Sequence, residues 1–462
     1  MNNIDKEVQA SQPDELSKDQ KRRKLNKHEK KERTHLQCEY FIAKKNRRCC
    51  MQRKADQKYC SEHLVDNNEP DKGERVPCPL DNNHSVWSKN LTNHLKKCNA
   101  KPKEKEEIWY EKDLNTKFGM DITEDSFKND GKNNDNDNED DDDDDLNEKE
   151  LYDKYIPILR NIKGHFEPLD FSISKHSGLK NRLSEVSNQK HAIQQSSLIG
   201  NMKKRGLLDI NKFYLEFGCG KGELSRFVNL SVLEDLQVED LARKSKYGYG
   251  FIDRGVNRMK MDSKIVKDAK ENTIEVNLTT KRSKIDIKDL HVDKFLKDID
   301  PEHVVVISKH LCGAATDLTF KLLLNSSLLQ GNSDRFGGLL IAMCCRHVCA
   351  YDQLLPESRA FLQSKGFRSL RSFNILKKIV SWAVCGKRDG TNAESTSEHI
   401  SGLTFKEREE LGLVARRLID ESRVFAMNLL VNPLGFHTEM FWYVEKEVTL
   451  ENVCLCIIPD SN

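Results

Sequence analysis

Four cysteines and histidines near the start of the sequence have the spacing of metal ligands. Ten residues separate Cys38 from Cys49, ten more separate Cys49 from Cys60, and His63 follows after a further two. Four sulfur and nitrogen donors match the tetrahedral preference of zinc. Cys50 is an alternative second ligand, but Cys49 makes the two arms equal. The set leaves no obvious open coordination position, so it predicts a structural zinc site.

A second set of donors follows closely. It consists of Cys78, His84, His94 and Cys98. His94 and Cys98 are four positions apart in an expected helix, so their side chains share one face. The alternative is scattered thiols and surface histidines in a flexible arm. We favour zinc at both sets, because residues 35–100 contain few aliphatic side chains and need another source of stability.

Glycines dominate a segment in the second half of the chain. The sequence EFGCGKG carries Glu216, Gly218, Gly220 and Gly222 between an apolar run and an amphipathic stretch. Glycines let the backbone approach a ligand, and a helix N-terminus favours negative charge. The spacing matches neither the nicotinamide fingerprint nor the nucleotide P-loop. Taken alone, the segment fits a tight turn as well as a cofactor site.

The pattern acid-x-Gly-x-Gly-x-Gly resembles the first motif of class I S-adenosylmethionine methyltransferases. In those enzymes the next strand ends in an acid that takes the ribose hydroxyls, and here Asp253 ends the next apolar run, 35 residues beyond Gly218. Asp286 or Asp289, after the third expected strand, could face the adenine amino group. The resemblance therefore adds Asp253 and Asp289 to the glycine segment as cofactor-binding residues.

Apolar runs and amphipathic stretches alternate from about Leu151 onward. The expected strands are 213–217, 247–253, 284–290, 303–309 and 338–345, with helices at 223–244 and 314–329. The last expected elements are strands at 373–385, 439–446 and 451–459 and a helix at 404–430. Strands that alternate with helices predict an α/β fold with a parallel sheet covered on both faces.

The fourth expected strand runs into Lys309 and His310. Base N-methyltransferases commonly carry Asn/Asp-Pro-Pro-aromatic at this point, and its absence here favours an oxygen acceptor. A ribose hydroxyl is a weak acid, so a positioned base would help, and Lys309 and His310 are the first candidates. Either could instead be a structural hydrogen-bonding group. The segment Cys344–Cys349 fits a third metal site, small buried thiols, or a substrate-facing loop in which Arg346 and His347 touch phosphate.

Charge is segregated along the chain despite a net charge of only +2. Residues 18–54 contain fifteen Lys/Arg and four Asp/Glu, whereas 135–145 are almost wholly Asp, Asn and Glu. The basic front suits phosphate backbones, and its alternative is a solvated tail. The expected domains are a disordered basic tail (1–34), a CCCH zinc finger (35–66), a CHHC zinc finger (75–100), a charged, acidic linker (101–149) and a Rossmann-like methyltransferase domain (150–462).

No apolar run is long enough for a membrane helix, and the first residues lack the apolar centre of a signal peptide. We therefore expect no membrane association and an intracellular location, in the cytoplasm or nucleus. Reduced thiols are expected there, which favours metal ligation over disulfides.

Both finger spacings together with EFGCGKGELS, SKHLCGAATD and CCRHVC resemble the tRNA 2′-O-methyltransferases that modify nucleotide 4 of the acceptor stem. The resemblance covers nearly the whole chain from about His35, and the second finger is similar to an RNA-binding module of spliceosomal proteins. It implies methyl transfer from S-adenosylmethionine to that ribose, two structural zinc ions, and tRNAs for glycine, proline and histidine as substrates. The doubled Cys49-Cys50 and the Asp/Asn run depart from the family pattern.

Other ribose methyltransferases carry a Lys-Asp-Lys-Glu tetrad that cannot be placed in this sequence, which leaves the catalytic base open. Two other functions are compatible with the motifs. One is an RNA-binding adaptor with an inactive methyltransferase fold, and the other is a methyltransferase acting on a base or on protein.

Overall fold

The computed structural model of this 462-residue chain describes residues 36–42, 47–49, 53, 56–60, 63, 75–98, 107–118, 143, 145–186, 189–237, 246–255, 257, 259–274, 276–330, 334–383 and 399–460. The chain divides into two compact units, Met1–Lys105 and Glu106–Asn462. Each unit is described by itself below.

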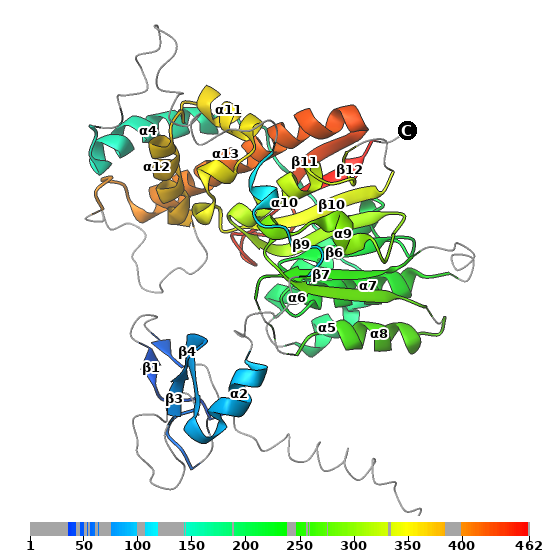
Figure 1. The fold of residues 1–462 in the computed structure, drawn as a ribbon. Coiled ribbons are helices and arrows are strands. Elements are labelled where there is room, and N and C mark those ends of the chain that lie inside the picture. The colour runs from blue at the N-terminus through cyan, green and yellow to red at the C-terminus, as the bar shows by residue number, and fades with distance from the viewer. Residues whose placement is uncertain are drawn as a thin grey trace, which may run out of the picture. The chain divides into compact units, whose positions relative to one another are not determined.

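Small elements make up the first unit (Figure 1). Strand β1 (Phe41–Ile42) pairs with β2 (Arg47–Arg48) in antiparallel fashion. Further along, β3 (Arg75–Cys78) pairs antiparallel with β4 (Asp81–Trp87), and helix α2 (Leu91–Lys97) follows. The buried apolar side chains that cluster in the described part of 36–63 are all cysteines, with one tyrosine packed against them. The described part of the first hairpin therefore contains no conventional apolar core.

An eight-stranded sheet forms the centre of the second unit (Figure 1). Its strands are β5 (Asp170–Phe171), β6 (Phe213–Phe217), β7 (Gly248–Asp253), β8 (Thr279–Lys284), β9 (Val304–Cys312), β10 (Phe336–Cys344), β11 (Phe436–Trp442) and β12 (Val453–Pro459). Across the sheet they are ordered β8-β7-β6-β9-β10-β12-β11-β5, and only β12 runs antiparallel to its neighbours.

The order of the strands defines the place where a ligand would bind. From β6 the chain adds β7 and β8 on one side and then returns to add β9 and β10 on the other. The strand order therefore reverses between β6 and β9. In open α/β sheets, ligands bind at this switch point, outside the carboxyl ends of the strands.

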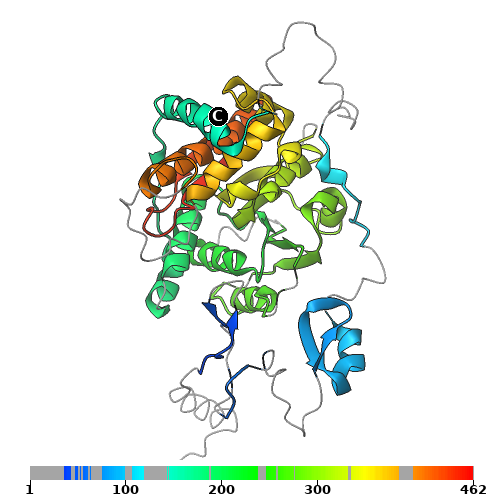
Figure 2. The same cartoon turned by 90° about the vertical axis from the view of Figure 1, so that its left-hand side faces the viewer.

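Helices cover both faces of the sheet (Figures 1 and 2). The described helices of the second unit are α4 (Glu148–Lys163), α5 (Lys180–Glu185), α6 (Lys190–Lys204), α7 (Glu223–Asp235), α8 (Asp262–Lys270), α9 (Val292–Leu296), α10 (Ala314–Leu324), α11 (Pro356–Ser364), α12 (Leu370–Val380) and α13 (Phe405–Val431). Within the described ranges, no helix has both the length and the apolar character needed to cross a membrane.

Strand β6 shows why both faces are covered. Phe213, Leu215 and Phe217 pack with α9, α10 and the end of α13, whereas Tyr214 packs with α6, α7 and α8. Successive strand side chains point to opposite faces, so a strand that is apolar throughout needs a layer on each side. A third apolar cluster joins α4, α12 and the first half of α13 into a helical bundle beside the sheet (Figure 2).

Most of the predicted strands are confirmed, but two are wrong. The third strand is β8 at Thr279–Lys284 and not 284–290. Its sequence, TTKRSK, is polar because it is an edge strand with partly exposed side chains. Residues 373–385 were expected as a strand, but Leu370–Val380 is helix α12. Its buried Phe373, Leu376 and Ile379 follow the helical spacing of three.

Helix α7 ends at Asp235 and α10 at Leu324, both earlier than predicted. The rest of the first expected helix, from residue 238 to 244, lies outside the described residues. The tail at 1–34 and the acidic run at 135–142 also lie outside them.

The segment 107–118 belongs to the second unit. Trp109 Nε1 donates a hydrogen bond to Ser283 Oγ at 2.9 Å, and Asn115 Nδ2 donates one to the backbone oxygen of Ile287 at 2.7 Å. The segment was expected in the charged linker at 101–149, but it packs beside the edge strand β8. Trp109 and Asn115 make these contacts, but the charged residues around them in the sequence suggest a solvated linker.

Buried charges tie α13 to the loop after β10. Arg346, which is 1% exposed, pairs with Asp420 at 2.7 Å and also with Glu451. Arg423 pairs with Asp317 at 2.7 Å and reaches Asp420 at 3.5 Å. Removing one partner from such a network leaves the other charge buried and unpaired.

We expect Asp420→Ala to lower the free energy of unfolding of the second unit by about 3–5 kcal/mol, because it removes the anion that two buried guanidinium groups share. Urea unfolding followed by circular dichroism measures this effect. The control is Asp153→Ala, which removes an exposed ion pair with Lys149 and should change stability little. Equal midpoints for the two variants would contradict the prediction.

Candidate active site and metal centres

Three glycines shape the loop between β6 and α7. Gly218, Gly220 and Gly222 have φ angles of 60°, 52° and 81°, in the left-handed region that favours glycine. A Cβ atom on Gly218 would lie 2.9 Å from the backbone oxygen of His310, so a larger residue would clash with β9. A Cβ atom on Gly220 would meet nothing within 4 Å. Open space therefore lies beside the exposed backbone of the loop, as an approaching ligand requires.

Asp253, at the end of β7, contacts this loop. Its Oδ2 accepts a hydrogen bond from the backbone nitrogen of Gly220 at 2.7 Å, and its Oδ1 accepts one from Gly255 at 2.7 Å. A carboxylate oxygen can accept more than one hydrogen bond. The half-buried carboxylate therefore keeps acceptor capacity for hydroxyl groups of a ligand. The structure therefore places the glycine loop and Asp253 next to each other, as the sequence predicts.

Glu216 lies behind the loop and is only 3% exposed. Its Oε2 accepts hydrogen bonds from the backbone nitrogen of Ser225, at 3.2 Å, and from the Ser225 hydroxyl. Burial raises the pKa of Glu216 to about 7. The side chain thus ties β6 to the first turn of α7 and supports the loop from its protein side.

Arg282, in β8, also holds the loop and was not found from the sequence. Its guanidinium donates to the backbone oxygen of Gly220 at 3.0 Å, pairs with Asp262 at 2.7 Å, and lies 4.4 Å from the ring centre of Phe251. Arg282 thus provides a hydrogen-bond donor for a backbone oxygen of the loop and holds the loop in place. An arginine in a polar strand gives no local signal of such a role.

Asp289 was predicted to bind the cofactor, on the basis of a strand ending at 290. Because β8 ends at Lys284, Asp289 instead lies in a 3₁₀ turn, Ile287–Asp289. Its Oδ1 accepts from the backbone nitrogen of Asp113 at 2.7 Å and from Lys288 Nζ at 2.8 Å. The structure therefore ties Asp289 to the segment 107–118. Asp286 lies closer to the end of the strand, and its side chain caps the same turn.

Three basic side chains gather at the carboxyl end of β9. Lys309 Nζ lies 2.9 Å from His191 Nδ1, and the rings of His191 and His310 are perpendicular with centres 6.3 Å apart. Desolvation lowers the pKa of Lys309 to about 8, and desolvation together with the Lys309 and His191 charges lowers the pKa of His310 to about 4. The Lys309 charge, followed by burial, lowers the pKa of His191. His191 comes from α6, and no local sequence pattern indicates its place here.

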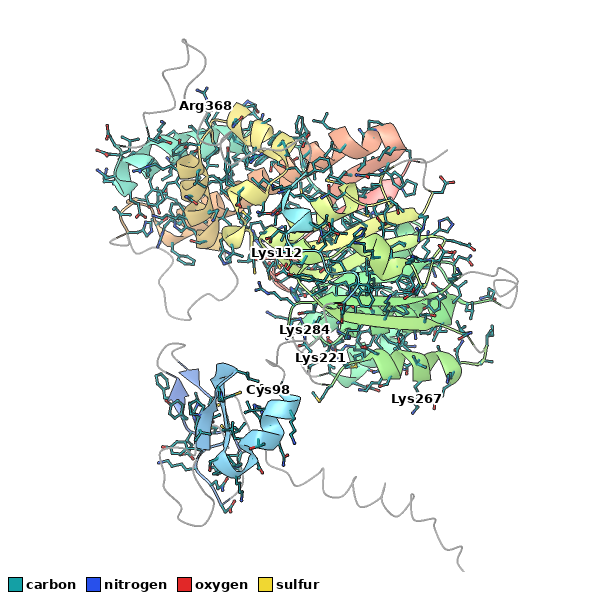
Figure 3. The ribbon with its side chains drawn as sticks, viewed as in Figure 1. Cys98, Lys112, Lys221, Lys267, Lys284 and Arg368 are labelled. Carbon is teal, nitrogen blue, oxygen red and sulfur yellow. The ribbon has the colours of Figure 1, made fainter. Side chains whose placement is uncertain are left out.

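Exposed lysines lie at the same edge of the sheet (Figure 3). Lys221 follows β6 within the glycine loop, and Lys284 is the last residue of β8. The edge that carries the basic cluster thus also presents cations to solvent.

The first predicted ligand set comes together in the structure. Ligand atoms of Cys38, Cys49, Cys60 and His63 all lie within 4.8 Å of one another. The three cysteines are buried, and the His63 ring stacks on Tyr40 with centres 3.8 Å apart. Thiolates and an imidazole nitrogen at these separations suit zinc. Cys50, the alternative ligand, lies outside the described residues.

Three members of the second set also meet. Cys78, His94 and Cys98 place their ligand atoms within 4.8 Å, with the two sulfurs 3.6 Å apart. Strand β3 supplies the first ligand, and α2 and its C-cap supply the other two. The backbone of His84 lies in β4, while its side chain is not among those described. The described donors again suit zinc.

The segment 344–349 contains two thiols close to a third, one thiol in an apolar cluster and a buried arginine. Cys344 and Cys345 lie near Cys312, whereas Cys349 is buried in an apolar cluster. Arg346 is buried in the ion-pair network described above and is not available to phosphate. His347 Nδ1 is buried and has no hydrogen-bond partner among the described residues.

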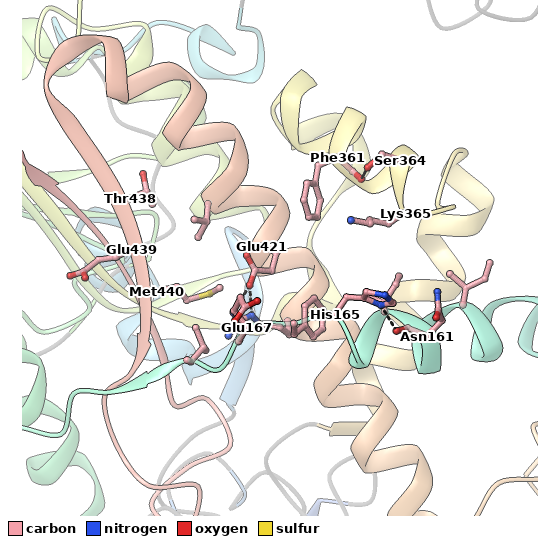
Figure 4. A pocket seen from close by; sticks show the side chains of 16 residues that line it. Asn161, His165, Glu167, Phe361, Ser364, Lys365, Glu421, Thr438, Glu439 and Met440 are labelled. Carbon is pink, nitrogen blue, oxygen red and sulfur yellow. Dashed lines mark hydrogen bonds and ion pairs between the residues drawn. The ribbon is translucent and has the colours of Figure 1, made fainter.

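A cavity of about 650 Å³ lies away from the glycine loop (Figure 4). It is bounded by α4, α11, α13 and β11, and His165, Phe361 and Glu421 are among its lining residues. None of its lining residues belongs to the glycine loop, β7 or β9. It is therefore distinct from the candidate cofactor site.

The sheet order, the glycine loop at the switch point and the acid at the end of the next strand define a class I, S-adenosylmethionine-dependent methyltransferase domain. A family model described as Methyltransferase TRM13 matches residues 193–458. Models described as a CCCH zinc finger in TRM13 protein and a U11-48K-like CHHC zinc finger match residues 36–64 and 75–99. The chain belongs to the TRM13 methyltransferase family.

Curated relatives match nearly the whole chain, and each is named tRNA:m(4)X modification enzyme TRM13. The protein of Debaryomyces hansenii is 95% identical over 462 residues, covering 100% of both chains. That of Scheffersomyces stipitis is 57% identical and covers 90% of this chain and 99% of its own. That of Saccharomyces cerevisiae is 36% identical and covers 91% and 96%.

Proposed function

We propose that this chain transfers a methyl group from S-adenosylmethionine to the ribose 2′-hydroxyl of nucleotide 4 in the acceptor stem of tRNA. The observation that carries the proposal is the position of the basic cluster: its residues lie beside the glycine loop, at the switch point of a methyltransferase sheet. The names of the relatives, which specify modification of tRNA at position 4, support the choice of substrate.

The cofactor site would be formed by the glycine loop and Asp253. The open space beside Gly220 would accommodate a ligand against the backbone. The Asp253 carboxylate, which accepts from the Gly220 nitrogen, would also accept hydrogen bonds from ribose hydroxyls. Glu216 and Arg282 position the loop. The chemistry that S-adenosylmethionine supplies is an electrophilic methyl group, and most of the rate gain is expected from alignment of the reacting groups.

Lys309 is the favoured base in this proposal. With a pKa near 8, a substantial fraction of its amine is neutral at physiological pH and can take the 2′-hydroxyl proton at Nζ. His191 Nδ1 orients that amine by accepting a hydrogen bond from it. His310, with a pKa near 4, stays neutral and serves as a hydrogen-bonding group for the substrate.

RNA would be held by the fingers and by the cationic edge of the sheet. The ligand sets hold two structural zinc ions in this proposal, one in each finger. Exposed Lys221 and Lys284 would contact phosphates near the reacting ribose. The wide minor groove of duplex RNA displays 2′-hydroxyls, so a stem is recognised largely by shape.

The proposal predicts a specific pH profile. Methyl transfer should rise with pH and level off above about 8, because only the neutral Lys309 amine accepts a proton. Lys309→Arg should lower the rate about 100-fold or more and remove that rise, since arginine stays protonated. Steady-state rates between pH 6 and 9.5, a range of about 3.5 units around this pKa, measure the effect.

Lys321→Arg is the matched control. Burial also lowers the pKa of Lys321 to about 8, but its Nζ donates to the backbone oxygen of Thr116. Its variant should keep the rise. A Lys309→Arg variant with an unchanged profile would exclude Lys309 as the base.

Transfer of a labelled methyl group to tRNA tests the function itself. A 2′-O-methyl group blocks alkaline cleavage, so the label should appear in an uncleaved dinucleotide containing nucleotide 4. A tRNA with a 2′-deoxyribose at that nucleotide should accept no label. Label on a base or on protein would support the alternative methyltransferase, and tRNA binding without transfer would support the inactive adaptor.

A further inference from the structure

Cys312, Cys344 and Cys345 form a thiol cluster at the carboxyl edge of the sheet, outside both zinc fingers. The Sγ atom of Cys312 lies 3.4 Å from that of Cys344 and 3.5 Å from that of Cys345. The three sulfurs all lie within 4.8 Å of one another. Cys312 is exposed and Cys344 is buried, so the cluster reaches from the protein interior to the solvent.

Backbone geometry brings the three thiols together. Cys312 and Cys344 are register partners in the parallel pair β9–β10, so their side chains leave the sheet on the same side. The next residue of a regular strand would point to the opposite face. Cys345 instead has a φ of 48°, a left-handed conformation that non-glycine residues adopt rarely. This left-handed turn brings the Cys345 thiol back to the side of the sheet where Cys312 and Cys344 lie.

The loops that carry the cluster are fixed in place. A Cβ atom on Gly313 would lie 2.6 Å from the backbone oxygen of Val348, so the end of β9 packs directly on the loop after β10. Arg346 donates to the backbone oxygen of Met343 at 2.8 Å and is held by Asp420. Strained backbone that is held rigidly by its surroundings is typical of functional sites.

The sulfur separations resemble those of the zinc fingers. In the fingers, Cys49 and Cys60 are 4.0 Å apart and Cys78 and Cys98 are 3.6 Å apart. A tetrahedral zinc ion with Zn–S bonds of about 2.3 Å places its sulfurs about 3.8 Å apart. The Cys312 sulfur lies 3.4 and 3.5 Å from the other two, and all three lie within 4.8 Å of one another, so the thiolates need only a small adjustment to hold such an ion.

We propose that Cys312, Cys344 and Cys345 form a third metal site, which binds a thiophilic divalent cation of the zinc type through three thiolates. Three protein ligands leave a fourth coordination position, as in open zinc sites. That position lies on the side of the exposed Cys312, where water or a substrate group can reach it. Soft thiolate ligands select zinc over magnesium or calcium.

Native mass spectrometry of the full chain, purified with zinc, tests the site independently of catalysis. We expect the wild-type chain to carry one zinc ion more than Cys312→Ser, a change at an exposed position that should not disturb folding. Cys454→Ala removes a buried thiol outside the cluster and should leave the zinc count unchanged. Cys60→Ser should remove a different zinc ion. A chain with both substitutions should therefore carry two zinc ions fewer than the wild-type chain.

Two results would overturn the proposal. The first is an equal zinc count in the wild-type chain and Cys312→Ser. The second is a wild-type chain whose denatured mass lacks two hydrogen atoms and whose peptide map joins Cys312 to Cys344 or Cys345, because the cluster would then be a disulfide pair. Metal binding should also slow alkylation of Cys312, and equal alkylation rates with and without zinc would contradict it.

Discussion

Asp253→Ala is expected to weaken S-adenosylmethionine binding by at least about 100-fold and to abolish methyl transfer. The carboxylate contacts the backbone nitrogens of Gly220 and Gly255, and it is the acid best placed to accept from ligand hydroxyls. A hydrogen bond to a charged group contributes about 1.5–3 kcal/mol. Losing two such bonds from the ligand hydroxyls therefore corresponds to an affinity that is weaker by about 100-fold or more. Isothermal titration calorimetry measures the affinity directly.

Asp268→Ala is the control for this experiment. Asp268 pairs with Arg226 at 2.7 Å on the neighbouring helices and lies outside the cofactor site. Its variant should bind the cofactor with wild-type affinity. If Asp253→Ala folded normally and bound as tightly as the wild-type chain, the assignment of the cofactor site would be wrong.

Cys49→Ser should release the zinc ion of the first finger and unfold residues 36–63, whereas Cys50→Ser should not. Among the described residues of this finger, the buried apolar cluster consists of three cysteines with Tyr59 packed against them. Zinc binding contributes about 10–16 kcal/mol in small fingers, far more than such a cluster can supply. The neighbouring cysteine is a closely matched control, because it differs in position by one residue.

Zinc content, limited proteolysis of the finger and tRNA affinity are the measurements. We expect tRNA affinity to fall at least about 10-fold in Cys49→Ser, because a phosphate-binding module is lost. Cofactor affinity should stay unchanged, since the sheet of the second unit has its own apolar cores. Zinc loss in Cys50→Ser but not in Cys49→Ser would show that Cys50 is the ligand and Cys49 is not.

Local sequence patterns predicted the features that depend on local chemistry. The spacing of Cys38, Cys60 and His63 predicted a ligand set, because chelation in a short chain depends on loop length. Apolar runs predicted β6, β7, β9 and β10, because strands buried on both faces must be apolar throughout. The glycine loop and Asp253 could both be predicted, because each lies at the end of one of these apolar strands.

Sequence reasoning failed where neighbours in space override local pattern. The edge strand β8 is polar, so the apolar pattern predicts a strand at 284–290 instead, and with it Asp289 as a cofactor-binding residue. Helix α12 was taken as a strand because its many apolar residues masked the spacing of three. Neither error could be seen without the partners of these segments.

The sequence by itself determined which chemical groups this protein can use: two sets of candidate zinc ligands, the glycine loop, and the basic residues at the carboxyl end of β9. Only the tertiary structure decided which of these groups meet. It brought His191 from α6 to Lys309, buried Arg346 against Asp420, and placed Cys312 beside the thiols of Cys344 and Cys345 at the end of β10. Such contacts join residues far apart in the chain, and their energies depend on burial and register, which no local pattern records.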